Sequence, residues 1–155
     1  MAELFDAEAL TEAIITGLEA LAFISPMPWD SELPGPELPA LVVSIAHHTD
    51  KTRTFWMIAS ESFGAHMVAN VLGGSEADSE PQTTAADVLK ELMNVASGAF
   101  LSAAHEASSA VLAIDLPIVQ SVHDERRWEE LVRSEGTIAL DADGHFIAIG
   151  MFEGA

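Results

Sequence analysis

The sequence contains no cysteine, and this absence excludes several classes of chemistry. Such a chain has no disulfide framework, thiol nucleophile or thiolate metal site, which is compatible with the cytosol. No uninterrupted apolar run approaches the roughly 20 residues that span a bilayer. The first 13 residues carry acidic side chains where a secretory signal has basic ones. We therefore expect a cytoplasmic protein that is not exported.

Basic residues are also scarce. Six Lys and Arg residues stand against 25 Asp and Glu residues, which gives a formal net charge of −19. A field of this sign repels phosphate backbones and anionic membrane surfaces, so we expect neither nucleic acid nor a membrane as a partner. The acidic excess mainly confers solubility, and it identifies no substrate.

The N-terminal half of the chain shows one helical pattern and two strand patterns. Apolar residues at helical spacing predict a helix over about 7–24. Five of the seven prolines fall in the next segment, 25–39, which excludes a helix and favours a surface loop. Alternation and β-branched residues predict strands over 40–48 and 53–60. A turn near 49–51 is expected to join them into a hairpin.

Two further helical patterns follow. The first, over 61–72, ends at a pair of glycines suited to a left-handed cap. A short acidic loop over 75–82 precedes a long helix over about 85–107. The segment 110–122 then predicts a strand that is interrupted at Pro117.

The C-terminal part predicts a closing hairpin over 136–152, with its turn at Asp143-Gly144. The charged stretch 124–135 before it is compatible with a short helix, and its pattern does not settle its conformation. Helices and hairpins are mixed without regular βαβ alternation, which predicts an α+β fold with a largely antiparallel sheet. At 155 residues, the whole chain, 1–155, is expected to form a single domain.

The helix over 85–107 has two contrasting faces. Thr84 and Asp87 approximate a capping box at its start. Steps of three and four residues define an apolar stripe, expected to pack on the sheet, and an opposite polar stripe. The apolar stripe consists of Leu89, Met93, Ala96, Phe100, Ala103 and Ala107. The polar stripe consists of Asp87, Glu91, Asn94, Gly98 and Ser102.

Glu91 and Asn94 are predicted to project side by side from the polar stripe. Asn is a mediocre helix former and a mid-helix Gly costs about 1 kcal/mol relative to Ala, so Asn94 and Gly98 are locally unfavourable. Gly98 lies about one turn beyond Asn94, and its missing side chain would let another protein's backbone approach. By spacing alone, an ordinary solvated face explains the same pattern.

The segment ELMNVASGAF (91–100) resembles the E-x-x-N-x-x-x-G helix of the CheX/CheC-type chemotaxis phosphatases, with Glu, Asn and Gly at the matching positions. ESFGAHMVANVLGG (61–74) resembles the preceding helix of that family and its glycine stop. LPIV (116–119) resembles the start of the strand that follows. The resemblance covers most of the chain and is weakest in the proline-rich loop and over 124–135.

This chain departs from the two-site CheC pattern. Its only asparagines are Asn70 and Asn94, and Met67 stands where a second motif would need Glu. In the first helix Glu12 is followed three residues later by Ile15, so that helix does not imitate the motif either. The single-site, CheX-like branch fits better.

The resemblance implies a phosphatase that hydrolyses the aspartyl-phosphate of a CheY-type response-regulator receiver domain. Glu91 would engage the receiver's active-site lysine. Asn94 could position the attacking water, because an amide offers both donors and an acceptor. The receiver would bring its own Mg²⁺, so this chain is expected to need no cofactor or metal of its own.

The resemblance also implies a homodimer whose sheets join edge to edge. The apolar segment FIAIGMF (146–152) is expected to lie beside a sheet edge that needs cover.

Two other functions remain open. A non-catalytic dimeric adaptor could keep the fold and bind a receiver or another signalling protein. A metal or small-ligand module would rest on scattered histidines, chiefly His47-His48. Adjacent strand residues point to opposite faces, so these two imidazoles do not naturally converge on a metal. DADG (141–144) resembles the start of a calcium loop but lacks the distant Glu, and a hairpin turn explains it.

Overall fold

The computed structural model describes residues 7–48, 52–72, 84–108 and 113–153, with the backbone alone at residues 7, 72, 101–108 and 153. The predicted turn near 49–51 and the predicted acidic loop over 75–82 lie outside these ranges. The described elements are α1 (Ala7–Ala22), β1 (Met27–Pro28), β2 (Ala40–His48), β3 (Thr52–Ser60), α2 (Glu61–Leu72), α3 (Ala85–Ser108), β4 (Ala113–Ile114), β5 (Ile118–Val122), α4 (Glu125–Val132), β6 (Ile138–Ala142) and β7 (His145–Glu153).

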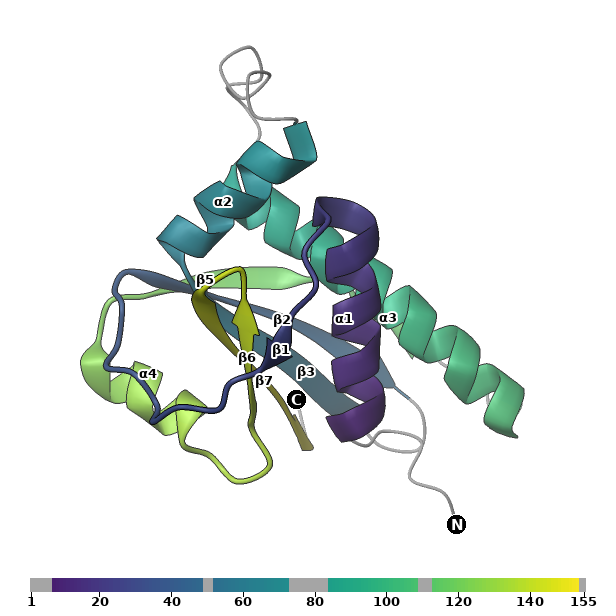
Figure 1. The fold of residues 1–155 in the computed structure, drawn as a ribbon. Coiled ribbons are helices and arrows are strands. Elements are labelled where there is room, and N and C mark those ends of the chain that lie inside the picture. Colours follow the sequence, from purple (N-terminus) through teal and green to yellow (C-terminus); the bar gives the residue numbers. More distant parts are fainter. Residues whose placement is uncertain (1–6, 49–51, 73–83, 109–112, 154–155) are drawn as a thin grey trace.

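The strands form one antiparallel sheet in the order β1-β6-β7-β3-β2, with β4 and β5 both paired to the outer side of β2 (Figure 1). Both predicted hairpins are present as the β2–β3 and β6–β7 pairs. Asp143 and Gly144 have φ values of 55° and 86°, as a tight two-residue hairpin turn requires. The predicted α+β class with an antiparallel sheet is confirmed.

We expected the C-terminal strand to lie at a sheet edge, and for most of its length this prediction is wrong. Over His145–Ile149, β7 pairs with β6 on one side, and its residues 147–153 pair with β3 on the other. Only the last residues, Gly150–Glu153, pair with β3 alone. The strand is apolar because both faces of the sheet are covered where it lies, which is the pattern of an inner strand.

The predicted interruption at Pro117 separates β4 from β5 along one edge. Ile114 lies opposite His47 and Ile118 lies opposite Ser44, so three residues of the edge strand face two residues of β2. This one-residue excess is a bulge. Proline suits that position because it has no N–H to contribute to the ladder.

Helices α1, α2 and α3 cover one face of the sheet, and α4 lies on the other (Figure 1). The larger core joins side chains of the three helices to the odd-numbered residues of β2 and β3, such as Val43 and Met57. The smaller core packs Trp128, Leu131 and Val132 of α4 against even-numbered residues of the same strands. Among the described helices, none is both long and apolar enough to cross a membrane.

The stretch 124–135, which the sequence left open, contains α4. Asp124 caps the helix by accepting a hydrogen bond from the backbone N–H of Arg126 at 2.9 Å. The charged residues of α4 face solvent and its few apolar residues are buried. This short helix is therefore held mainly by packing on the sheet rather than by its intrinsic propensity.

His47 and His48 point to opposite sides of the sheet, as strand geometry predicted. His47 is fully buried, with its ring centroid 4.3 Å from that of Phe55 and 6.0 Å from that of Phe100. His48 is partly exposed, and its ring nitrogens lie 3.0 Å from the Thr52 hydroxyl and 3.0 Å from an Asp115 carboxylate oxygen. Burial, with a smaller contribution from His48, lowers the pKa of His47 from 6.5 to about 4.

The depressed pKa of His47 predicts a pH-dependent stability. Since the unfolded chain takes up this proton near pH 6.5, the stability due to the neutral imidazole is complete above that pH and is lost as pH falls toward 4. In the parent chain, this protonation should lower the free energy of unfolding by about 2 kcal/mol between pH 6.5 and pH 4. His47→Leu should remove that part of the decrease. Urea unfolding at stepped pH measures this. The control variant is His123→Gln, at an exposed histidine. If the unfolding free energy of His47→Leu falls with pH as steeply as that of the parent chain, the prediction is contradicted.

Candidate functional site

The start of α3 is fixed by a capping box. The Thr84 hydroxyl accepts a hydrogen bond from the Asp87 backbone N–H at 3.2 Å, and an Asp87 carboxylate oxygen accepts from the Thr84 backbone N–H at 3.3 Å. Asp87 also accepts from the Thr84 hydroxyl at 3.0 Å. The predicted cap is confirmed, and it fixes where the helix begins.

The apolar stripe of α3 packs on the sheet as predicted. Its first four members, Leu89, Met93, Ala96 and Phe100, are at most 3% exposed. The Phe100 ring meets the Phe55 ring of β3 edge-on at 5.0 Å. The side chains of Ala103 and Ala107 lie outside the described part of the chain.

The opposite stripe of α3 is open to solvent. Asp87, Glu91, Asn94 and Gly98 are all exposed, while the side chain of Ser102 is not described. Residues three or four apart lie about 5–6 Å from one another on a helix surface, so Glu91 and Asn94 form one polar patch. A Cβ built on Gly98 would meet no described atom within 4 Å. No close packing contact among the described residues therefore explains why a glycine, which destabilises a helix, stands at position 98.

The two other helices on this face pack closely against α3. A Cβ added to Gly17 of α1 would lie 2.9 Å from Leu92, and one added to Gly64 of α2 would lie 2.4 Å from the Ala85 side chain. Both glycines therefore permit close helix packing. Ala85 and Leu92 are seven residues apart and share one side of α3, away from Glu91 and Asn94, which remain exposed among the described residues.

The second asparagine of the chain has a structural role. The Asn70 side-chain amide donates to the backbone carbonyl of Ala22, the last residue of α1, at 2.9 Å. It satisfies a carbonyl that has no partner within its own helix. Asn70 is thus engaged in holding the end of α1, and the assignment of Asn94 alone to an E-x-x-N site remains a prediction from the sequence.

Sequence reasoning missed a histidine pair at the junction of α2 and the β6–β7 hairpin. The His66 ring stacks on His145 at 5.2 Å, and its Nε2 lies 2.9 Å from an Asp143 carboxylate oxygen. His66 and Asp143 are 77 positions apart, so no local pattern could reveal the contact. Among the described residues, no three His, Asp or Glu side chains are placed to hold a metal ion.

No family model and no curated protein matches the sequence. Solved structures do match. A chemotaxis protein CheX from Desulfovibrio desulfuricans aligns over 96% of this chain and 98% of its own, with a TM-score of 0.66 at 14% identity. The CheX of a CheX–CheY complex with BeF3 and Mg²⁺ from Borrelia burgdorferi aligns over 99% and 100%, with a TM-score of 0.64 at 13% identity.

The chain has a CheX/CheC-like fold. A CheC-like superfamily protein from a Shewanella species, similar over 100% of both chains at 14% identity with a TM-score of 0.63, has the same architecture. The fold that the E-x-x-N resemblance implied is therefore confirmed. At these identities the likeness concerns the CheX/CheC-like fold alone.

The exposure of the patch predicts that its side chains contribute little to stability. Glu91→Ala and Asn94→Ala should each change the free energy of unfolding by no more than about 0.5 kcal/mol. The neighbouring Met93→Ala, which empties a buried position on the same helix, should cost about 2–5 kcal/mol. Urea denaturation of the three variants checks this. A loss above about 1 kcal/mol for Asn94→Ala would assign that side chain a structural role.

Proposed function

We propose that this chain is a cytoplasmic phosphatase that hydrolyses the aspartyl-phosphate of a CheY-type receiver domain. The observation that carries the proposal is the exposed pair Glu91 and Asn94 on a helix of a CheX/CheC-like fold. A CheX with the same fold has been crystallised in complex with CheY, BeF3 and Mg²⁺. That complex supports a receiver domain as the partner here.

Hydrolysis of an aspartyl-phosphate requires few catalytic groups from the phosphatase. Aspartyl-phosphate is hydrolysed by in-line attack of water on phosphorus, so the main tasks are to position the water and to complement charge around the phosphoryl group. The Asn94 amide has donors and an acceptor and does not titrate near neutrality, so it can hold the water in line. It need not act as a base.

Glu91 is assigned to docking. An ionised carboxylate three residues before Asn94 would pair with the active-site lysine of the receiver and set the register of the two proteins. Gly98, one turn beyond, would let the receiver's backbone approach the helix closely. The receiver would supply the phosphorylated Asp and the Mg²⁺, so this chain contributes no nucleophile and no metal ligand.

Two variants separate the two roles. Asn94→Ala should lower the turnover of a phosphorylated cognate receiver by about 100-fold, because the amide acts on the attacking water. Glu91→Gln should act mainly through affinity, and its effect should shrink as salt rises, because the lost contact is an ion pair at an interface. The readout is the loss of label from the receiver over a range of receiver concentrations.

Glu19→Gln is the matched control, since it removes one exposed charge from the neighbouring α1 and should leave activity unchanged. If Asn94→Ala works as fast as the parent protein, the catalytic proposal is wrong. A non-catalytic adaptor that binds the receiver would then take its place.

We also propose a homodimer, with the edge formed by β4 and β5 as its interface. That edge pairs only with β2 among the described residues and exposes Ile114, Leu116 and Ile118, with Leu116 at 83%. Two antiparallel copies of such an edge could pair around a twofold axis and cover one another's apolar residues.

Light scattering at micromolar concentration should report a dimer. Ile118→Lys should convert it to a monomer, because a lysine on an edge strand opposes pairing. Phe152→Lys, at an exposed apolar position on β7, is the control and should leave the dimer intact. A monomeric parent protein, or a dimer that only Phe152→Lys disrupts, would contradict this interface.

A further inference from the structure

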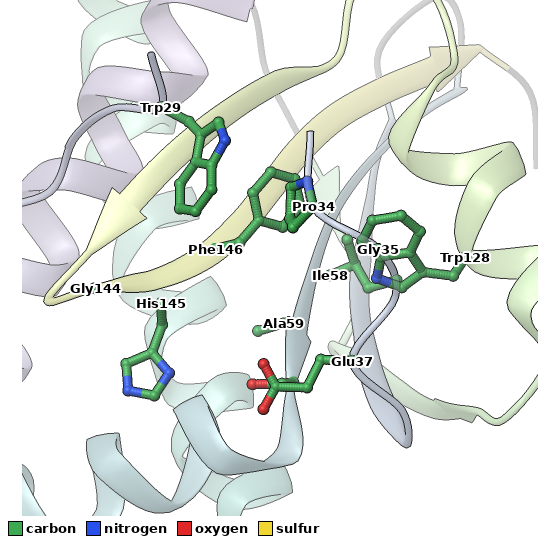
Figure 2. A pocket seen from close by; sticks show the side chains of 11 residues that line it. Trp29, Pro34, Gly35, Glu37, Ile58, Ala59, Trp128, Gly144, His145 and Phe146 are labelled. Atoms are coloured by element: carbon green, nitrogen blue, oxygen red, sulfur yellow. The ribbon is translucent and has the colours of Figure 1, made fainter. Parts of the chain in front are cut away.

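A pocket of about 140 Å³ opens on the α4 side of the sheet, on the face opposite α3. Its lining comes from the loop after β1, the end of β3, the β6–β7 hairpin and α4 (Figure 2). The volume is close to that of a cavity able to hold benzene, at about 150 Å³. The pocket can therefore hold one small organic group.

One side of the pocket is a row of three aromatic rings. Phe146 lies between Trp29 and Trp128, with ring centroids 5.1 Å from Trp29 and 5.9 Å from Trp128 (Figure 2). The Trp29 indole N–H donates to the carbonyl of Glu32 at 3.0 Å, which ties this ring to its own loop. Aromatic faces held in fixed positions attract cations through the ring quadrupole.

The other side of the pocket is polar and acidic. In Figure 2 the Glu37 carboxylate and the His145 imidazole lie away from the aromatic row. The Ser62 hydroxyl donates to one Glu37 oxygen at 2.6 Å and lies 3.1 Å from the Ser60 hydroxyl. No described Lys or Arg pairs with Glu37 or lines the pocket. The carboxylate is thus oriented by a hydroxyl and not neutralised.

We infer that this pocket binds a small organic cation of the quaternary ammonium or guanidinium class. The aromatic row would hold the cation by its charge and apolar surface, and Glu37 would complement that charge. An anion would face both Glu37 and a net charge of −19. A neutral apolar ligand would fill the aromatic side but desolvate Glu37 without compensation.

Two arginines, Arg126 in α4 and Arg133 directly after it, already have acidic partners in the same segment. Arg126 lies 3.5 Å from Glu130, and Arg133 pairs with Glu129. Neither lines the pocket. The proposed site also does not depend on the phosphatase proposal, because the sheet lies between the pocket and the Glu91–Asn94 patch.

The test is a titration of the purified chain with choline and, separately, methylguanidinium, followed by calorimetry and tryptophan fluorescence. At least one of the two cations should bind saturably. For choline, the neutral isostere 3,3-dimethyl-1-butanol should bind about fivefold more weakly, because it keeps the shape and loses the charge. Whichever cation binds identifies the class.

Glu37→Gln should weaken binding of that cation about fivefold, and Trp29→Leu should also weaken it. Glu32→Gln removes a charge from the same loop outside the pocket and should bind like the parent chain. The inference is overturned if neither cation binds saturably. It is equally overturned if the neutral isostere binds as tightly as choline, or if Glu37→Gln retains full affinity while remaining folded.

Discussion

The packing of one face of α3 on the sheet determines the direction of its opposite face. Leu89, Met93, Ala96 and Phe100 are buried against the sheet, and the helical repeat then directs Glu91 and Asn94 to solvent. Rotating α3 to bury either polar residue would expose large apolar side chains, at about 25 cal/mol for each Å². The polar patch is therefore positioned by the core beneath it.

The remaining elements support this arrangement. Gly17 and Gly64 allow α1 and α2 to pack closely against α3 without covering the patch, and Asn70 completes the end of α1. The other face of the sheet carries a second, smaller core with α4. The proposed phosphatase surface and the proposed cation pocket consequently lie on opposite sides of one sheet.

The features that could be predicted from sequence are those that depend on neighbours in the chain. The Thr84 capping box, the Asp143-Gly144 turn and the two faces of α3 follow from spacings of a few residues, and each is confirmed. The inner position of β7 depends on which strands pair across the whole sheet. The edge position that we expected for this strand was therefore wrong.

The His66–Asp143 contact and the aromatic row depend in the same way on residues brought together from distant segments. The exposure of Glu91 and Asn94 was predicted from sequence. Their catalytic roles remain a proposal, because exposure and spacing alone do not distinguish a catalytic pair from a solvated one.

The most direct measurement of the central claim is the dephosphorylation of receiver domains from the same organism, with and without this protein. Each receiver is phosphorylated, and the loss of its label is followed in the presence of Mg²⁺. The account predicts that the protein accelerates the loss for one receiver or a small subset, with multiple turnovers per chain. Equal rates with and without the protein for every receiver would contradict it.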